Sequence, residues 1–83
     1  MTMTTERLEE LLDRARQRRR LPDPKTRRLL RERAGITQAA LAEAVGVSRA
    51  ALCRWELGDR EPDEQFLAKY LAALDRLARE AVS

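Results

Sequence analysis

The sequence has few of the residues that build metal sites, disulfides or catalytic centres. Its 83 residues include no histidine and a single cysteine, Cys53, which excludes an internal disulfide and leaves too few ligands for a structural zinc site. Glu56 resembles a catalytic carboxylate only in isolation, because it has no second acid at a defined spacing, and the chain has no nucleophile–base pair. We therefore expect no enzymatic activity, no cofactor and no metal, and the lone cysteine fits a reducing cytoplasm.

Other scarcities limit the fold and the partners. Three glycines, three prolines and the absence of alternating β-branched runs favour helices over strands. One tryptophan, one tyrosine and one phenylalanine cannot form the stacking surface of a single-strand nucleic-acid binder. No apolar run approaches the roughly 18 residues that a membrane span needs, so we expect no membrane partner. A chain of this length supports one compact domain with a small core.

Charge is abundant but unevenly placed around a formal net charge of +3. Residues 14–33 contain ten Lys/Arg and two acids, whereas residues 34–83 contain six basic and eight acidic side chains. This asymmetry is typical of a protein with a polyanionic partner on one side. A solvated basic helix end would give the same local pattern, so charge alone does not identify DNA.

Residues 1–22 predict an amphipathic helix followed by a basic linker. Thr4 or Thr5 can cap the helix, and a break follows at Leu21–Pro24. Two roles remain open for this helix: packing on the final helix or contact in a dimer. With either packing, its basic end could reach DNA phosphates or a minor groove. The apolar stripe is Leu8, Leu11, Leu12 and Ala15, and the basic end includes Arg18, Arg19 and Arg20.

Residues 23–83 predict a second unit whose strongest local signal lies between Thr37 and Leu57. Thr37 can cap a short helix, Gly46 offers the positive φ of a tight turn, and Ser48 can cap the next helix. Two short helices joined in this way form a helix-turn-helix, whose second helix can enter a DNA groove. Further helices are predicted over about residues 24–34, with Asp23 as a cap, and from about residue 63 onward.

The outward face of the second helix of this motif predicts base contacts. An arginine can hold guanine O6 and N7 with two hydrogen bonds. The N-termini of both motif helices offer N–H groups to phosphates, which makes Gln38 and Ser48 predicted phosphate contacts. Trp55 is expected in the core or at its rim rather than stacked on bases. The predicted base contacts are Arg49, Ala50, Cys53 and Arg54.

The sequence resembles the Cro/C1 (XRE-type) helix-turn-helix family of phage and bacterial repressors over roughly residues 24–75. The matching segments are Gly35-Ile36-Thr37-Gln38, Leu41-Ala42, Gly46-Val47-Ser48 and Trp55-Glu56-Leu57-Gly58, followed by Arg60 and Pro62. The resemblance implies an all-α, lambda-repressor-like domain of five helices, to which this chain adds an N-terminal helix. It also implies phosphate contact by Arg60 and a structural ion pair between Arg31 and Glu56.

These features predict a sequence-specific, double-stranded DNA-binding transcriptional regulator. We expect repression by operator occupancy, a homodimer on a palindromic operator, and no small-molecule ligand, because the chain offers no room for an inducer pocket. Two alternatives stay open. An antitoxin would use the same fold to bind DNA and a toxin and would co-purify with it. A DNA-bending recombination accessory protein would discriminate little between operator-like and random duplexes.

Overall fold

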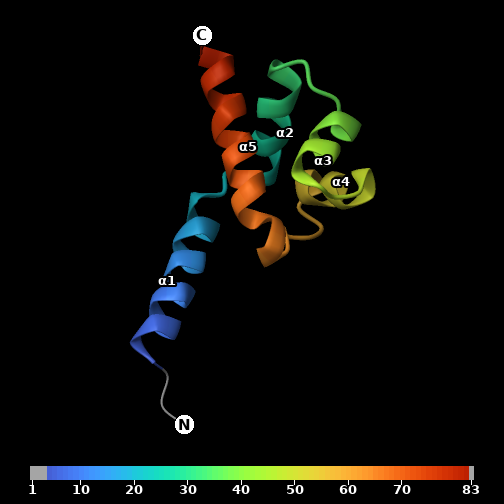
Figure 1. Ribbon diagram of the computed structural model, residues 1–83. Helices are drawn as coiled ribbons and strands as arrows, with labels where there is room; N and C mark the ends of the chain where they lie inside the picture. The colour runs from blue at the N-terminus through green and yellow to red at the C-terminus, as the bar shows by residue number, and fades with distance from the viewer. Residues whose placement is uncertain (1–3, 83) are drawn as a thin grey trace.

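The computed structural model describes residues 4–82, which contain five helices and no strand. The all-helical class predicted from composition is confirmed. The N-terminal helix is one of these five, so the chain after residue 22 contributes four. None of the described helices is long and apolar enough to cross a membrane. The helices are α1 (Thr5–Arg20), α2 (Pro24–Arg33), α3 (Gln38–Val45), α4 (Arg49–Leu57) and α5 (Glu64–Val82) (Figure 1).

Hydrogen bonds from side chains to the backbone explain where most of the helices begin. Thr4, Thr37 and Ser48 each accept a hydrogen bond from the N–H three residues later, at 3.1 Å, which satisfies a donor that the helix leaves unpaired. Asp23 occupies the corresponding position before α2, but its side chain does not cap the helix. Its carboxylate accepts from the Thr26 hydroxyl instead, and this hydrogen bond lowers the pKa of Asp23.

The turn between α3 and α4 depends on Gly46. Its φ of 90° lies in the left-handed region, where a side chain would be strained, and its N–H closes α3 by donating to the Ala42 carbonyl at 2.8 Å. Ser48 then starts α4 two residues later. The predicted short turn with a positive-φ glycine is confirmed, and it fixes α4 across α3.

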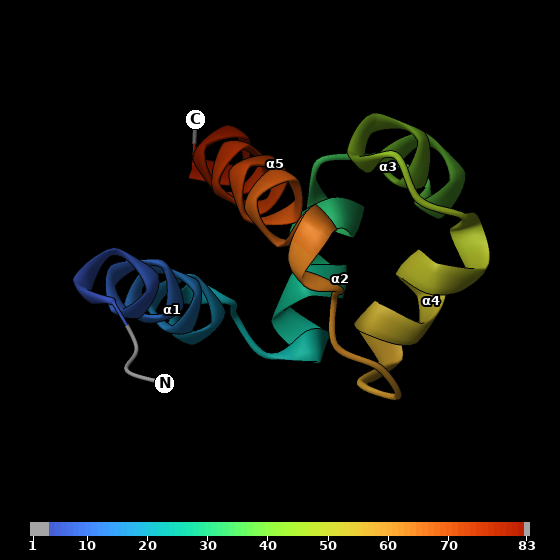
Figure 2. The same ribbon diagram turned by 60° about the horizontal axis from the view of Figure 1, so that its bottom comes forward.

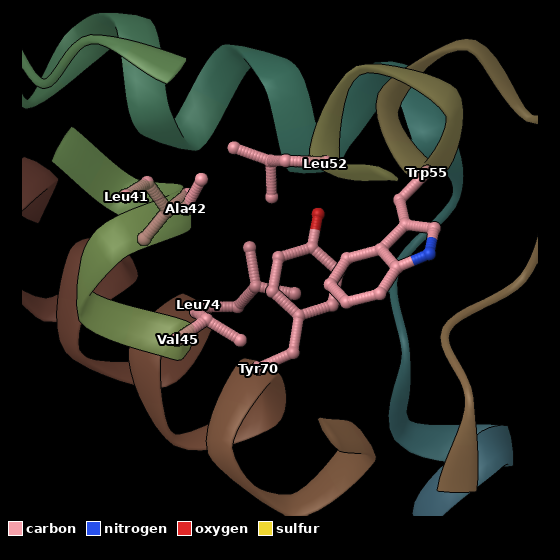
Figure 3. Packing of buried hydrophobic residues seen from close by; sticks show 7 residues of the cluster. All are labelled: Leu41, Ala42, Val45, Leu52, Trp55, Tyr70 and Leu74. Atoms are coloured by element: carbon pink, nitrogen blue, oxygen red, sulfur yellow. The ribbon is translucent and has the colours of Figure 1, made fainter. Parts of the chain in front are cut away.

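A small hydrophobic core joins α3, α4 and α5 (Figure 3). Trp55 is 1% exposed, and the centroid of its ring system lies 4.9 Å from that of the Tyr70 ring in a tilted arrangement, a favourable geometry for two aromatic side chains. Burial raises the pKa of the Tyr70 hydroxyl. Trp55 is therefore a core residue and is not available to bases. The remaining members of the cluster are Leu41, Ala42, Val45, Leu52 and Leu74.

Helix α1 packs against α5 and contributes no buried residue. Three arginines in its second half contact the α5 side of the molecule. Arg14 pairs with Glu64 at 3.3 Å, Arg20 pairs with Asp75 at 2.8 Å, and Arg18 donates to the Pro62 carbonyl. Figures 1 and 2 show α1 on the opposite side of the molecule from α3 and α4, and Figure 1 shows its first turns extending past the start of α5.

Candidate nucleic-acid interface

The outward face of α4 carries two arginines that the rest of the described chain leaves uncovered. Arg49, Ala50 and Arg54 are exposed, and Cys53 between them is half-buried. Within residues 4–82, neither the Arg49 nor the Arg54 side chain makes a hydrogen bond or an ion pair. On the opposite face of the same helix, Leu52 is fully buried. Helix α4 is thus held from beneath while its two guanidinium groups point to solvent.

An open groove of about 500 Å³ lies where the N-terminus of α3 meets the start of α4. The side chains of Gln38 and Arg49 lie along it, with Arg31 at its base. The first N–H groups of a helix lack intrahelical partners and favour an anion. Ser48 uses its hydroxyl oxygen to cap α4, so its contribution here comes from the helix N-terminus that it starts. The groove has the charge and donors to hold a phosphate.

A buried ion pair fixes α4 to the helices beside it. Arg31 of α2 donates from Nε to Glu56 Oε2 at 2.6 Å and from Nη2 to Oε1 at 2.9 Å. Gln38 donates its Nε2 to Glu56 Oε1 at 3.0 Å. Burial alone would raise the pKa of the Glu56 carboxyl, but the hydrogen bonds from Arg31 and Gln38 outweigh it and lower that pKa. The same pairing raises the pKa of Arg31.

This network gives Gln38 a second task beside the predicted phosphate contact. Its amide nitrogen carries two hydrogens, and one of them points to Glu56. The other hydrogen and the side-chain carbonyl remain for the groove. The carboxylate of Glu56 therefore joins α2, α3 and α4 through Arg31 and Gln38 and fixes the orientation of α4.

A comparison of the sequence with models of known protein families agrees with this arrangement. The model of the helix-turn-helix family (HTH_3) matches residues 28–80, which is more than half of the chain. The chain belongs to the helix-turn-helix family. Its resemblance to Cro/C1-type proteins is thereby confirmed, and membership makes it a DNA-binding regulator. Neither a search of curated proteins nor a search of solved structures found a match.

The helix-turn-helix domain also contains a buried arginine that sequence reasoning missed. Arg27 is 3% exposed. It donates to the backbone carbonyls of Pro22 at 2.7 Å and Trp55 at 3.0 Å, and it pairs with Glu61 at 3.3 Å. It thereby ties the start of α2 to the end of α4. Arg27 lies four residues before Arg31, which puts both side chains on one face of α2. Since Arg31 was expected in an internal ion pair, this spacing could have indicated that Arg27 is buried as well.

The structure does not bring every predicted phosphate contact to the α3–α4 surface of the helix-turn-helix domain. Arg18 and Arg20 contact the α5 side of the molecule, and Arg19 is exposed on the same end of α1. Because α1 lies on the far side from α4, we leave these three out of the proposed interface. Arg60 is exposed in the loop after α4, 3.5 Å from Asp63. Residues 4–82 contain no group of three potential metal ligands.

Proposed function

We propose that this helix-turn-helix protein recognises a specific sequence in double-stranded DNA by placing α4 in the major groove. One observation carries the proposal: Arg49 and Arg54 are exposed and have no partner within residues 4–82, on a helix whose other face is locked in the core. A surface guanidinium with no partner of its own is ready to bind guanine without first breaking an internal contact.

The residues between these two arginines suit close approach to bases. Ala50 and Cys53 line a shallow hollow beside Arg49, so α4 can sit deep in a groove without a bulky side chain in the way. Ala50 can contact a thymine methyl group. We propose that Arg49 and Arg54 each read a guanine and that Ala50 and Cys53 set the fit between them.

Phosphate contacts on both sides of α4 would fix its register on the duplex. Gln38 and the N-terminus of α3 line the groove described above, and Ser48 brings the N-terminus of α4 to the same surface. We propose that both contact phosphates of one strand. Arg60 lies in the loop that follows α4. Contacts of this kind position a protein on DNA and carry no sequence information themselves.

We propose that the protein acts as a repressor by occupying an operator, since steric exclusion of the transcription machinery requires no further activity. A homodimer on a palindromic site, with half-sites about 10 base pairs apart, is the usual geometry for a helix-turn-helix protein. This reading needs no small-molecule ligand.

The test begins with a selection of bound duplexes from a random library, which yields a preferred site. Arg54→Ala and Arg49→Ala should each weaken binding to that site about 5- to 150-fold, the equivalent of 1–3 kcal/mol for a lost bidentate contact. Binding to a scrambled duplex should change little. Arg79→Ala is the matched control, because Arg79 is an exposed arginine on α5. Equal losses on both duplexes would show that the two arginines touch only phosphates.

A further inference from the structure

The two halves of α1 have different surroundings. The second half is held against the α5 side of the molecule by Arg14, Arg18 and Arg20. The first half extends past α5 (Figure 1), and two of its leucines are open to solvent: Leu8 is 47% exposed and Leu12 is 37% exposed. Residues at this spacing lie on one side of a helix, so the two leucines present a small apolar surface to solvent.

The exposed leucines form a ridge that α5 does not cover. Leu8 and Leu12 are four residues apart, so they lie one above the other on the same side of α1. Leu11 and Ala15, beside this ridge, are half-buried. The apolar stripe of α1 is therefore divided lengthwise, with one edge turned toward α5 and the other edge available to a second molecule.

The charges along α1 indicate which molecule fits this ridge. The first nine residues of the helix carry four acids and one arginine, and the last seven carry five arginines and no acid. Glu9 and Arg16 are seven residues apart and share one side of the helix, next to the leucines. A second α1 running antiparallel would set the acidic half of each helix beside the basic half of the other, whereas a parallel one would oppose like charges.

We propose that α1 pairs antiparallel with α1 of a second copy of this chain. The two Leu12 side chains would meet near the two-fold axis, Leu8 would pack beside the stem of the partner's Arg16, and Glu9 of each copy would lie opposite Arg16 of the other. This rests on the proposed function, because it supplies the contact surface for the homodimer on a palindromic operator. The arrangement has two-fold symmetry, so it closes at two copies. Arg16 also contacts Asp13 at 2.8 Å, but its side chain is 56% exposed and remains accessible.

Another apolar surface competes for the same leucines. A groove of about 310 Å³ between α3 and α5 is lined mainly by apolar side chains, among them Ile36, Ala44 and Leu77. A leucine ridge inserted there from a second copy would be a head-to-tail contact, which leads to open-ended assembly unless it closes into a ring. The charge pattern along α1 favours the symmetric pair, because it complements itself.

The experiment is sedimentation equilibrium of the full chain without DNA, from micromolar to millimolar protein. We expect the mass to rise from 9.5 kDa toward twice that value and not beyond. The double variant Leu8→Glu/Leu12→Glu should stay monomeric throughout. Glu9→Arg and Arg16→Glu should each weaken association about tenfold, because each reverses two symmetric ion pairs. Combining them as E9R/R16E should restore the dimer.

A matched control separates this effect from a general loss of helix. Glu10 is exposed on α1 and pairs within the helix with Arg7, so Glu10→Arg changes the same net charge away from the ridge and should leave the dimer intact. Far-UV circular dichroism checks that every variant keeps its helix content.

Three results would overturn the proposal. The first is a monomer at every concentration, and the second is a dimer that persists in Leu8→Glu/Leu12→Glu. The third is a dimer that dissociates when Ala44→Glu places a charge in the α3–α5 groove. A single half-site titrated with the same variants keeps the two proposals apart. On a single half-site, a variant that has lost the dimer should still bind its preferred sequence through α4. Conversely, if α4 did not discriminate between sequences, the sedimentation measurements of the dimer would be unchanged.

Discussion

Replacing Glu56 with leucine tests the buried network that holds α4 in place. The change removes the carboxylate and leaves the guanidinium of Arg31, whose side chain is 11% exposed, without its partner. Gln38 loses the acceptor for its amide N–H as well. Leucine fills most of the vacated volume, so the effect reports the loss of charge compensation rather than a large cavity.

The expected cost is a large share of the total stability. Removing one member of a buried ion pair costs about 3–5 kcal/mol, because an uncompensated charge stays behind. A chain of 83 residues has a free energy of unfolding of about 4–12 kcal/mol by the usual per-residue range. Glu56→Leu should therefore lower the melting temperature by at least about 12 °C, at 4–8 °C per kcal/mol. The double variant Arg31→Met/Glu56→Leu, which removes both charges, should recover most of this loss.

Urea denaturation followed by tryptophan fluorescence measures the effect directly, because Trp55 is the single tryptophan and is buried in the native core. Glu10→Gln serves as the control, since its ion pair with Arg7 is exposed and should leave the midpoint unchanged. Two outcomes would refute the reasoning: a Glu56→Leu cost below about 1 kcal/mol, typical of a surface pair, or a double variant as unstable as the single one.

Further predictions concern acid, backbone, salt and truncation. The folded pKa of Glu56 lies below its usual value of 4.5, so its contribution to stability is complete above that pH and is lost as pH falls through the folded value. Urea midpoints measured at decreasing pH should therefore fall in this range for the wild type, and this loss should be absent in Glu56→Leu. Gly46→Ala should cost about 1–2 kcal/mol for its positive φ alone. Gly58→Ala should cost more in the same titration, because its Cβ would lie 3.2 Å from Pro24 Cγ. Plots of log affinity for DNA against log salt should fall with a slope of about −0.9 per phosphate contact, and a flat line would contradict the proposed phosphate contacts. Deleting residues 1–20 should leave α2–α5 folded by circular dichroism, because α1 contributes no buried residue; an unfolded product would place α1 in the core.

Helix boundaries were predictable because their causes are local. The caps at Thr37 and Ser48 each involve a hydrogen bond to a residue three positions away, and Gly46 ends α3 through its own φ. The helical spacing of apolar residues likewise predicted that Leu52 and Trp55 face inward, and both are buried. Such features depend on short stretches of chain that the sequence displays directly.

Features that need several distant segments were not predictable in the same way. The burial of Arg27 requires acceptors from the linker before α2, from the end of α4 and from the loop after it. The sequence left two roles open for the apolar stripe of α1: packing on the final helix or contact in a dimer. It could not decide between them because it does not reveal how far α1 runs past α5. The sequence likewise does not reveal that Arg18 and Arg20, predicted as phosphate contacts, contact acceptors on or beside α5.

The 16-residue length of α1 has a consequence for how new binding sites could arise. A helix rises 1.5 Å and turns 100° per residue. In the proposed dimer, inserting or deleting residues in α1 would therefore move and rotate α4 of one copy relative to α4 of the other without altering either helix. Spacing preference and base preference would then be inherited on separate stretches of the gene, and evolution could retune the distance between half-sites while the code read at each half-site stayed the same.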